Sequence, residues 1–357
     1  MKATVLHIIE SLAVGGAEVL LTESLKDITN EYRHVLVYMR QPATLLSAVK
    51  VDKVYCLNYK GKRSFLESIF QLRKIIQREN ISLIHSHHYW PTIVARLAKP
   101  TSVPLIFSVH NPLSKDAFNL NRLSFYLEKY TYQSKQHAVF VSEAVKKDYS
   151  ASIGLKGKAT VLYNFVAEKF YDERYLKPTK ERQTKLHMIA VGTLKHQKNY
   201  QYLLKVMALL KQREIYLDVI GEGPLMQELK AIVEENALRN VRLLGACNNV
   251  HEILKNYDAF ILASTYEGMS LAVIEAMAVG LPCILSDIEP NREVTAGHAI
   301  FFDLNNAEDC VARITELAED AELRNKLSLA GKARAEMFQK QKYLSQLEGL
   351  YKQYLPW

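Results

Sequence analysis

The chain has 357 residues, of which 48% are apolar and 24% are charged, a composition that excludes disordered and fibrous classes. This length exceeds a single ordinary core and predicts two domains. The four cysteines are far apart and form no CxxC pair, which argues against a disulfide framework or a cysteine metal site. No apolar run approaches the ~20 residues of a membrane span, so we expect a cytoplasmic protein.

The charge is distributed unevenly along the chain. The formal net charge is +8, and residues 1–180 carry 26 Lys and Arg against 15 Asp and Glu, whereas the remainder carries 20 against 23. A basic first half predicts an anionic partner, such as a phospholipid surface, a phosphate-bearing acceptor or nucleic acid. The alternative is an ordinary solvated basic surface.

Short β-branched runs alternate with helical patterns in the first half, which is typical of βα units around a parallel sheet. A helix is expected at 64–80, and the charged segment 168–185, which contains a proline, predicts a linker. Strands are expected at 3–9, 34–39, 83–88, 104–110, 138–142 and 159–164.

The same alternation resumes after the linker, with a helix expected at 198–212. Strands are expected at 187–192, 215–221, 241–246, 259–264, 282–286 and 299–303. Continuous apolar strands indicate sheets that are covered on both faces. The sequence therefore predicts an α/β protein with two doubly wound, Rossmann-like domains, 1–170 and 186–337, and a C-terminal helix at 338–357 that packs on the first domain. Ligands of such sheets bind beyond the carboxyl ends of the strands, so the cleft between the domains is the expected site.

The stretch YEGMSLAVIEAM (266–277) places two glutamates, Glu267 and Glu275, on either side of an apolar run, although carboxylates disfavour burial without a partner. Gly268 predicts a turn, and Ser270 is expected to cap a helix that ends at Gly280. The helix start at Met269, Ser270 and Leu271 would present backbone N–H groups to a phosphate.

The two glutamates are spaced to hold two sugar rings. Five residues, or about 7.5 Å along a helix axis, separate Ser270 from Glu275, which is about the span from a diphosphate to a ribose diol. Glu275 could accept hydrogen bonds from the ribose, and Glu267 from a second sugar. The pattern predicts a nucleotide sugar as the ligand. The alternative is a capped helix with a part-exposed Glu275 and a surface Glu267.

This pair of glutamates, with seven residues between them, resembles the EX7E motif of retaining glycosyltransferases of family 4, which have the two-domain GT-B fold. The resemblance extends over nearly the whole chain through the order and spacing of GGAE (15–18), VSEAV (141–145), VGTLKHQKN (191–199), VIGEGP (219–224) and VRLLG (241–245). It implies a hexosyltransferase-type enzyme that moves a sugar from a UDP- or GDP-linked donor to a hydroxyl acceptor, with no metal or other cofactor. The second domain would hold the donor and the basic first domain the acceptor.

The resemblance also implies roles for residues of the first domain. Gly15 and Gly16, in the loop after the first strand, would border the donor diphosphate and the acceptor, although a tight turn would also use glycine. His110, at the end of a strand, would lie beside the transferred sugar. Members of the family often have an aspartate where this chain has Asn111, so no carboxylate partner for His110 is visible.

In the second domain the resemblance implies that Lys198 neutralises the leaving diphosphate. Thr193 stands where many relatives have an arginine, and a hydroxyl does not replace that charged fork. Lys195 could supply the missing charge. The nucleobase pocket would lie around Leu244, Gly245 and Val250.

The run HSHH (85–88) suggests a possible metal site, because His85 and His87 would point to the same side of a strand. No Asp-x-Asp sequence lies nearby to hold a divalent ion, and the resemblance implies catalysis without a metal. We therefore expect these histidines to contact the acceptor or to line the cleft rather than to bind a metal.

The basic first half, with the aromatic residues of YLEKYTYQ (126–133), fits a glycan growing on a polyprenyl diphosphate lipid. The expected setting is polysaccharide, capsule or lipopolysaccharide synthesis at the inner face of the cytoplasmic membrane, with peripheral membrane contact and no nucleic acid. Two alternatives stay open: a sugar-nucleotide epimerase or phosphorylase on the same scaffold, and a non-catalytic nucleotide- or polyanion-binding protein.

Overall fold

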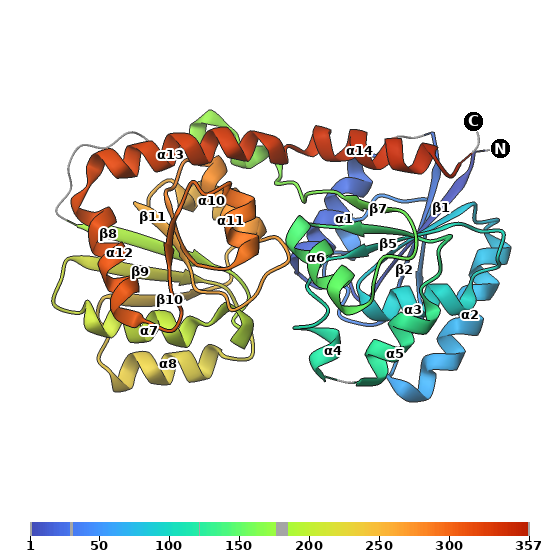
Figure 1. Ribbon diagram of the computed structural model, residues 1–357, viewed down its shortest axis with the longest axis horizontal. Coiled ribbons are helices and arrows are strands. Elements are labelled where there is room, and N and C mark those ends of the chain that lie inside the picture. The colour runs from blue at the N-terminus through green and yellow to red at the C-terminus, as the bar shows by residue number, and fades with distance from the viewer. Residues whose placement is uncertain (1, 29–30, 121, 176–184, 356–357) are drawn as a thin grey trace. The chain divides into compact units, whose positions relative to one another are not determined.

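The computed structural model (Figure 1) describes residues 2–28, 31–120, 122–175 and 185–355 of the chain. The chain forms two compact units. The first unit combines Met1–Phe165 with Lys340–Trp357, and the second comprises Val166–Gln339. The described part of the expected linker, 168–175, therefore belongs to the second unit, where the buried ring of Phe170 contacts His251.

The described part of the first unit contains a seven-stranded parallel sheet in the order β3-β2-β1-β4-β5-β6-β7. The central strand β1 is buried at every residue, and Leu6 pairs with Val35 on one side and Ile84 on the other. The strands are β1 (Thr4–Ile9), β2 (Arg33–Tyr38), β3 (Lys53–Cys56), β4 (Leu83–His87), β5 (Leu105–Val109), β6 (His137–Phe140) and β7 (Ala159–Val161).

Helices cover both faces of this sheet, because alternate residues of each strand point to opposite faces. Val5 and Ile9 of β1 pack in one cluster with α1 and α14, whereas Leu6 and Ile8 pack in another with α2 and α3. The helices are α1 (Gly16–Asp27), α2 (Phe65–Arg78), α3 (Tyr89–Ala98), α4 (Ala117–Leu120), α5 (Arg122–Thr131), α6 (Glu143–Ser152) and α14 (Lys340–Lys352).

The last helix, α14, is fixed to the first unit by apolar and polar contacts. Leu344 and Leu347 join the cluster with α1, and Lys340 forms an ion pair with Asp27. The Tyr351 hydroxyl lies 2.6 Å from Nδ1 of His85 in the middle of the sheet. Helix α14 is therefore a structural part of the first unit.

The second unit repeats this architecture with a six-stranded parallel sheet in the order β10-β9-β8-β11-β12-β13 in the described residues. Its strands are β8 (Leu186–Val191), β9 (Ile215–Ile220), β10 (Val241–Gly245), β11 (Ala259–Leu262), β12 (Cys283–Ser286) and β13 (Ile300–Phe302). Its helices are α7 (Tyr200–Leu209), α8 (Met226–Glu235), α9 (Val250–Leu254), α10 (Leu271–Ala278), α11 (Glu289–Thr295), α12 (Ala307–Glu319) and α13 (Ala321–Ala335).

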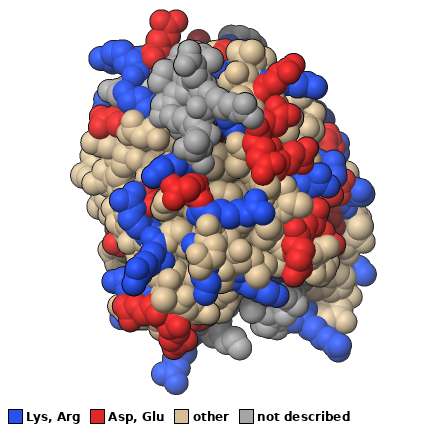
Figure 2. Space-filling view, turned by 90° about the vertical axis from the view of Figure 1, so that its left-hand side faces the viewer, with Lys and Arg blue, Asp and Glu red and all other residues tan. Residues whose placement is uncertain are grey.

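Figure 2 looks onto the left-hand side of Figure 1 and shows Lys and Arg interspersed with Asp and Glu, with neither sign covering that face. No helix within the described ranges is both long enough and apolar enough to cross a bilayer.

The predicted fold class, two doubly wound α/β domains, is confirmed. One strand, β3, was not predicted, because KVYC is short, lies at the sheet edge and exposes Lys53 and Val54, so it lacks the apolar run of a central strand. The expected helices at 64–80 and 198–212 correspond to α2 and α7.

A buried ion pair joins α3 to α5 in the first unit. Arg96 and Glu128, whose side chains are 1% and 2% exposed, are 2.8 Å apart in a two-pronged contact. The Tyr149 hydroxyl also donates to Glu128, and the Arg96 guanidinium lies 4.5 Å above the ring of Phe107. Loss of either partner would leave a buried charge without its counter-ion.

We therefore expect Glu128→Ala to lower the free energy of unfolding by about 3–5 kcal/mol, since Arg96 would remain buried and uncompensated. Urea denaturation followed by circular dichroism measures the loss. Glu143→Ala, which removes the exposed ion pair with Lys146, is the control and should cost less than about 1 kcal/mol. Equal losses for the two variants would contradict the assignment.

Candidate active site

The candidate site lies at the carboxyl edge of the second sheet, where the loops after β8, β9, β10 and β11 emerge. The loop after β11 leads into α10 and contains Glu267, Gly268, Met269 and Ser270, all of which are buried. Gly280, with a φ of 86°, follows the helix and lets the chain turn away from it. The expected helix and its glycine end are therefore present.

Ser270 occupies the N-cap position of α10, but its side chain does not cap the helix. The hydroxyl is buried and has no hydrogen-bond partner among the described residues. The predicted capping bond is thus wrong, although the backbone of Ser270 is extended, as is usual for an N-cap residue. A buried hydroxyl without a partner costs about 1–3 kcal/mol, and a ligand oxygen at the helix start would satisfy it.

Glu267 is 5% exposed, which excludes the alternative of a surface carboxylate. It accepts hydrogen bonds from Lys198 Nζ at 2.6 Å and from Ser264 Oγ at 2.6 Å. The sequence analysis assigned Glu267 and Lys198 to separate parts of the donor, whereas the structure joins them in one ion pair. Each charge compensates the other in a site that is largely removed from water.

Further hydrogen bonds connect the two loops that carry this pair. Gln197 Nε2 donates to Tyr266 O at 2.9 Å, and Thr265 N donates to Gln197 O at 2.9 Å. Ser286 Oγ donates to Ser264 O at 2.7 Å and so connects the loop to β12. This network holds the ion pair in place before any ligand binds, a condition for electrostatic catalysis.

Lys195 lies on the same loop as Lys198, three residues earlier, and its side chain is exposed. Tyr200, whose hydroxyl donates to Gly192 O at 3.1 Å, lies beneath this loop. Burial and the negative charge of Glu267 both raise the pKa of Tyr200, so it stays a neutral donor. The loop therefore carries two lysines, of which one is committed to Glu267 and one is exposed.

Glu275 lies in the second turn of α10 and is partly exposed. The protein atoms packed around its carboxyl group nevertheless keep water away and raise the pKa of Glu275 to about 7. The positive charge of Lys169 opposes this shift. Glu275 can thus change its protonation state near neutral pH. A hydroxyl-bearing ligand would favour the carboxylate form, because ionised oxygens only accept hydrogen bonds.

The residues expected around the nucleobase end β10 and begin α9. Leu244 is 44% exposed, and Val250 is the first residue of α9. Gly245 has a φ of 75° and accepts a hydrogen bond from the N–H of Gly221 at 2.8 Å. An added Cβ at Gly221 would lie 1.9 Å from Gly192 O, so only glycine lets the loop after β9 approach the loop after β8.

In the first unit, Gly15 and Gly16 lie at the start of α1. Gly15 is the N-cap residue in an extended conformation, and its carbonyl accepts the N–H of Val19 at 2.9 Å. The preceding residue, Val14, is 68% exposed. Gly15 and Gly16 therefore begin α1 at the end of the loop that follows β1, and a role in binding diphosphate stays a prediction.

His110 follows β5, and its partner is another histidine. Its Nε2 lies 3.3 Å from Nδ1 of His87, and its ring contacts that of His88 at 5.3 Å. Asn111 instead donates to Asp116 Oδ2 at 3.3 Å. Burial keeps the pKa of His110 and of His87 well below the usual value, so both rings are neutral. The partner that sequence analysis could not identify is therefore an imidazole.

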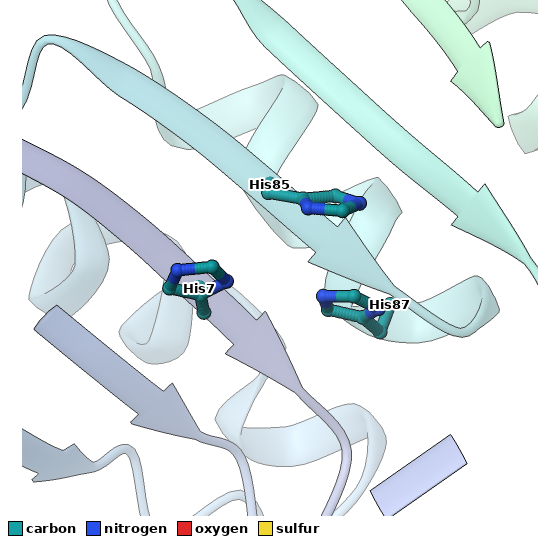
Figure 3. A group of neighbouring side chains, drawn as sticks. All are labelled: His7, His85 and His87. Atoms are coloured by element: carbon teal, nitrogen blue, oxygen red, sulfur yellow. The ribbon is translucent and has the colours of Figure 1, made fainter. Parts of the chain in front are cut away.

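His7, His85 and His87 form a buried group on β1 and β4, with one nitrogen from each ring facing the same space (Figure 3). These nitrogens lie within 4.8 Å of one another, which makes this the group among the described residues that could hold a metal ion. Nδ1 of His7 and Nε2 of His87 have no hydrogen-bond partner there.

His85, however, uses both of its nitrogens, at 2.6 Å from the Tyr351 hydroxyl and 2.8 Å from Ser108 Oγ. Burial lowers the pKa of His85 to about 3, so it remains neutral. A metal would have to displace one of these two partners, so the donor set fits a metal poorly. The ring of His85 is 1% exposed and bonded within the fold. The expectation that these histidines contact the acceptor or line the cleft stays a prediction.

Comparison with known proteins assigns both halves of the chain. Residues 14–170 match the family model described as "Glycosyltransferase Family 4", and residues 172–334 match "Glycosyl transferases group 1". The uncharacterized glycosyltransferase MJ1178 of Methanocaldococcus jannaschii is 25% identical over 95% of either chain.

Two further proteins are similar to this chain. The UDP-Gal:alpha-D-GlcNAc-diphosphoundecaprenol alpha-1,3-galactosyltransferase of Escherichia coli is 26% identical over 71% of either chain. The solved structure of Anabaena Alr3699/HepE in complex with UDP and glucose has a TM-score of 0.85 at 17% identity, over 98% of this chain and 100% of that one, and shares the fold. Because the two family models together account for nearly the whole length, the chain belongs to the GT-B glycosyltransferases of family 4 and is a sugar-transferring enzyme.

Proposed function

We propose that this glycosyltransferase retains the anomeric configuration as it moves a sugar from a UDP-linked donor to a hydroxyl of a glycan on a polyprenyl diphosphate lipid. The observation that carries the proposal is the ion pair of the buried Glu267 with Lys198, together with the hydroxyl of Ser270, three residues after Glu267, which has no partner among the described residues. This arrangement presents positive charge and a hydrogen-bond donor at the start of a helix.

The donor diphosphate would occupy the N-terminal end of α10. Ser270 would donate its hydroxyl to a phosphoryl oxygen, and the positive end of the helix dipole would face the same group. Lys198 would gain a second anionic partner, and Lys195 is exposed and near enough in the chain to add a second positive charge. These groups supply the countercharge that a metal ion often supplies, so we propose that no metal takes part.

The two glutamates would hold the two sugar rings. Glu275 would accept hydrogen bonds from the ribose hydroxyls, which would favour its ionised form. Glu267 would orient the transferred sugar while it holds Lys198 in place. Leu244 and Val250 would line the nucleobase pocket.

In the proposed reaction the acceptor hydroxyl attacks the anomeric carbon on the face from which the diphosphate departs. The bond from the anomeric carbon to the phosphate oxygen breaks with its electron pair, and the acceptor proton passes to that oxygen. Lys198 would stabilise the charge on the departing group. His110 would hydrogen-bond the transferred sugar as a neutral imidazole, because burial disfavours its charged form.

Two relatives support the choice of substrates. The name of the Escherichia coli galactosyltransferase specifies UDP-Gal, and the Anabaena protein was solved in complex with UDP and glucose, which favours UDP over GDP. The name of the former also specifies an acceptor on diphosphoundecaprenol. We therefore place the reaction in surface polysaccharide synthesis, such as that of capsule or lipopolysaccharide, at the inner face of the cytoplasmic membrane. Peripheral contact there would bring the enzyme to its lipid-linked acceptor.

Incubation with radiolabelled UDP-sugars, with and without polyprenyl-diphosphate glycans and in the presence of EDTA, tests this function. We expect UDP release and labelled lipid only when the acceptor is present, at the same rate with EDTA as without it. Interconversion of the sugar without an acceptor would indicate an epimerase. Complete loss of transfer in EDTA would contradict the metal-free proposal.

We expect Glu267→Gln to lower kcat by about 10²–10³-fold, because the amide neither orients the sugar as an anion nor holds Lys198 in place. The substitution keeps the side-chain volume, and a thermal melt checks that the variant folds. Glu234→Gln, an exposed glutamate on α8, is the control and should transfer sugar at the wild-type rate. Transfer at an unchanged rate in the Glu267 variant would refute the assigned role.

The raised pKa of Glu275 predicts how donor affinity depends on pH. Below a pKa of about 7 the carboxyl is neutral in the free protein, so binding that needs the carboxylate must first remove a proton. The Kd for UDP-glucose should be about tenfold weaker one unit below that pKa than one unit above it. Glu275→Gln should bind more weakly and lose this dependence, as isothermal titration calorimetry would show.

The same shift has the opposite effect on the free protein. Because the folded pKa of Glu275 is raised, its contribution to stability is present at low pH and is lost as the pH rises through about 7. In the ligand-free protein, the free energy of unfolding should therefore fall less for Glu275→Gln than for the wild type as the pH rises through about 7. If wild type and variant show the same pH profiles of binding and stability, Glu275 does not titrate there.

A further inference from the structure

Three helices on one face of the first sheet together expose six large apolar side chains. Helix α3 contacts both α2 and α5, and Figure 1 shows the three helices along the same side of the first unit. We call the outer side of these helices the α2–α5 face. It exposes Leu66 (67%), Phe70 (59%), Leu97 (38%), Leu123 (52%), Tyr126 (52%) and Tyr130 (76%).

The outward direction of these side chains is fixed by what the inner sides of the helices contact. On α5, Glu128 is buried against Arg96, and the carbonyl of Ser124 accepts a hydrogen bond from Tyr89 OH at 2.6 Å. Leu123, Tyr126 and Tyr130 follow the helical spacing of the opposite side. The rings of Tyr126 and Tyr130 stack with their centroids 6.3 Å apart, so these two side chains form one aromatic patch.

Most charges on the α2–α5 face are positive. The exposed acidic residue in the described part of these three helices is Glu67, which accepts a hydrogen bond from Gln71. The acid of α5, Glu128, is buried and neutralised by Arg96. The exposed basic residues are Arg73, Lys74, Arg78, Arg122 and Lys129.

We infer that the α2–α5 face binds the surface of an anionic phospholipid bilayer. Tyrosine is enriched where protein meets the headgroup region, and leucine and phenylalanine side chains insert below it. Lysine and arginine attract anionic headgroups. A second copy of the chain would fit the same face poorly, because two such faces would oppose their like charges. The inference rests on the proposed function, since a lipid-linked acceptor gives this surface its use.

Co-sedimentation of the full chain with lipid vesicles tests this inference. We expect binding to vesicles of phosphatidylcholine with phosphatidylglycerol, at least about tenfold weaker binding to phosphatidylcholine alone, and weaker binding as salt is added. Two double variants address the two contributions. Tyr126→Ser with Tyr130→Ser removes the aromatic contacts, and Arg122→Gln with Lys129→Gln removes charge. Each should weaken binding to anionic vesicles by about tenfold or more.

The matched control is Lys326→Gln with Leu329→Ser on α13, which removes an exposed lysine and an exposed leucine from the second unit. It should bind vesicles as the wild type does. The inference would be overturned if variants of the α2–α5 face bound anionic vesicles as the wild type does. It would also be overturned if the wild type did not bind anionic vesicles. A dimer in gel filtration that only the face variants disrupt would replace the bilayer by a second copy.

The thermal shift caused by UDP-glucose separates this inference from the proposed function. All the substituted residues are exposed and lie in the first unit or on α13, so each variant should keep the wild-type shift. If the wild type shows no shift with nucleotide sugars, the donor site fails, whereas the vesicle assay still reports on the α2–α5 face.

Discussion

One electrostatic constraint, the pairing of Glu267 with Lys198 at the carboxyl edge of the second sheet, organises the candidate active site. Either charge alone would be costly where it lies, and together they are compensated. The pair is held by the loops after β8 and β11, which are bonded to each other and to β12. Lys198, whose side chain is 16% exposed, is therefore held in place without a ligand, and preorganisation of this kind lowers a barrier that depends on charge development.

Much of this organisation was predictable from sequence. Unbroken apolar strands indicated two parallel sheets, and the stretch between Glu267 and Glu275 indicated a helix start, which is present as α10. The edge strand β3 was missed because it has only four residues and exposes Lys53 and Val54, so it lacks the apolar run of a buried strand. The sequence also could not show that Ser270 fails to cap α10. A serine at the N-cap position favours a capping hydrogen bond but does not require one.

Contacts between distant parts of the chain were the least predictable. The bond between His87 and His110 spans two strands, and the role of His85 depends on Tyr351 at the far end of the sequence. Histidine pairs leave no local signature, because either nitrogen can donate or accept and neither partner must be charged. Two tyrosines in an ordinary helical pattern likewise do not reveal which side of α5 is occupied by the ion pair with Arg96.

Amide hydrogen exchange upon addition of UDP-glucose is the measurement that tests the central claim most directly. Backbone N–H groups at the start of a helix lack intrahelical partners, so a bound diphosphate should slow their exchange. We predict that UDP-glucose slows amide exchange at residues 268–272 and in the loop carrying Lys198. The slowing should be smaller in a Lys198→Ala variant. Tight binding of the donor with exchange unchanged in both segments would contradict it.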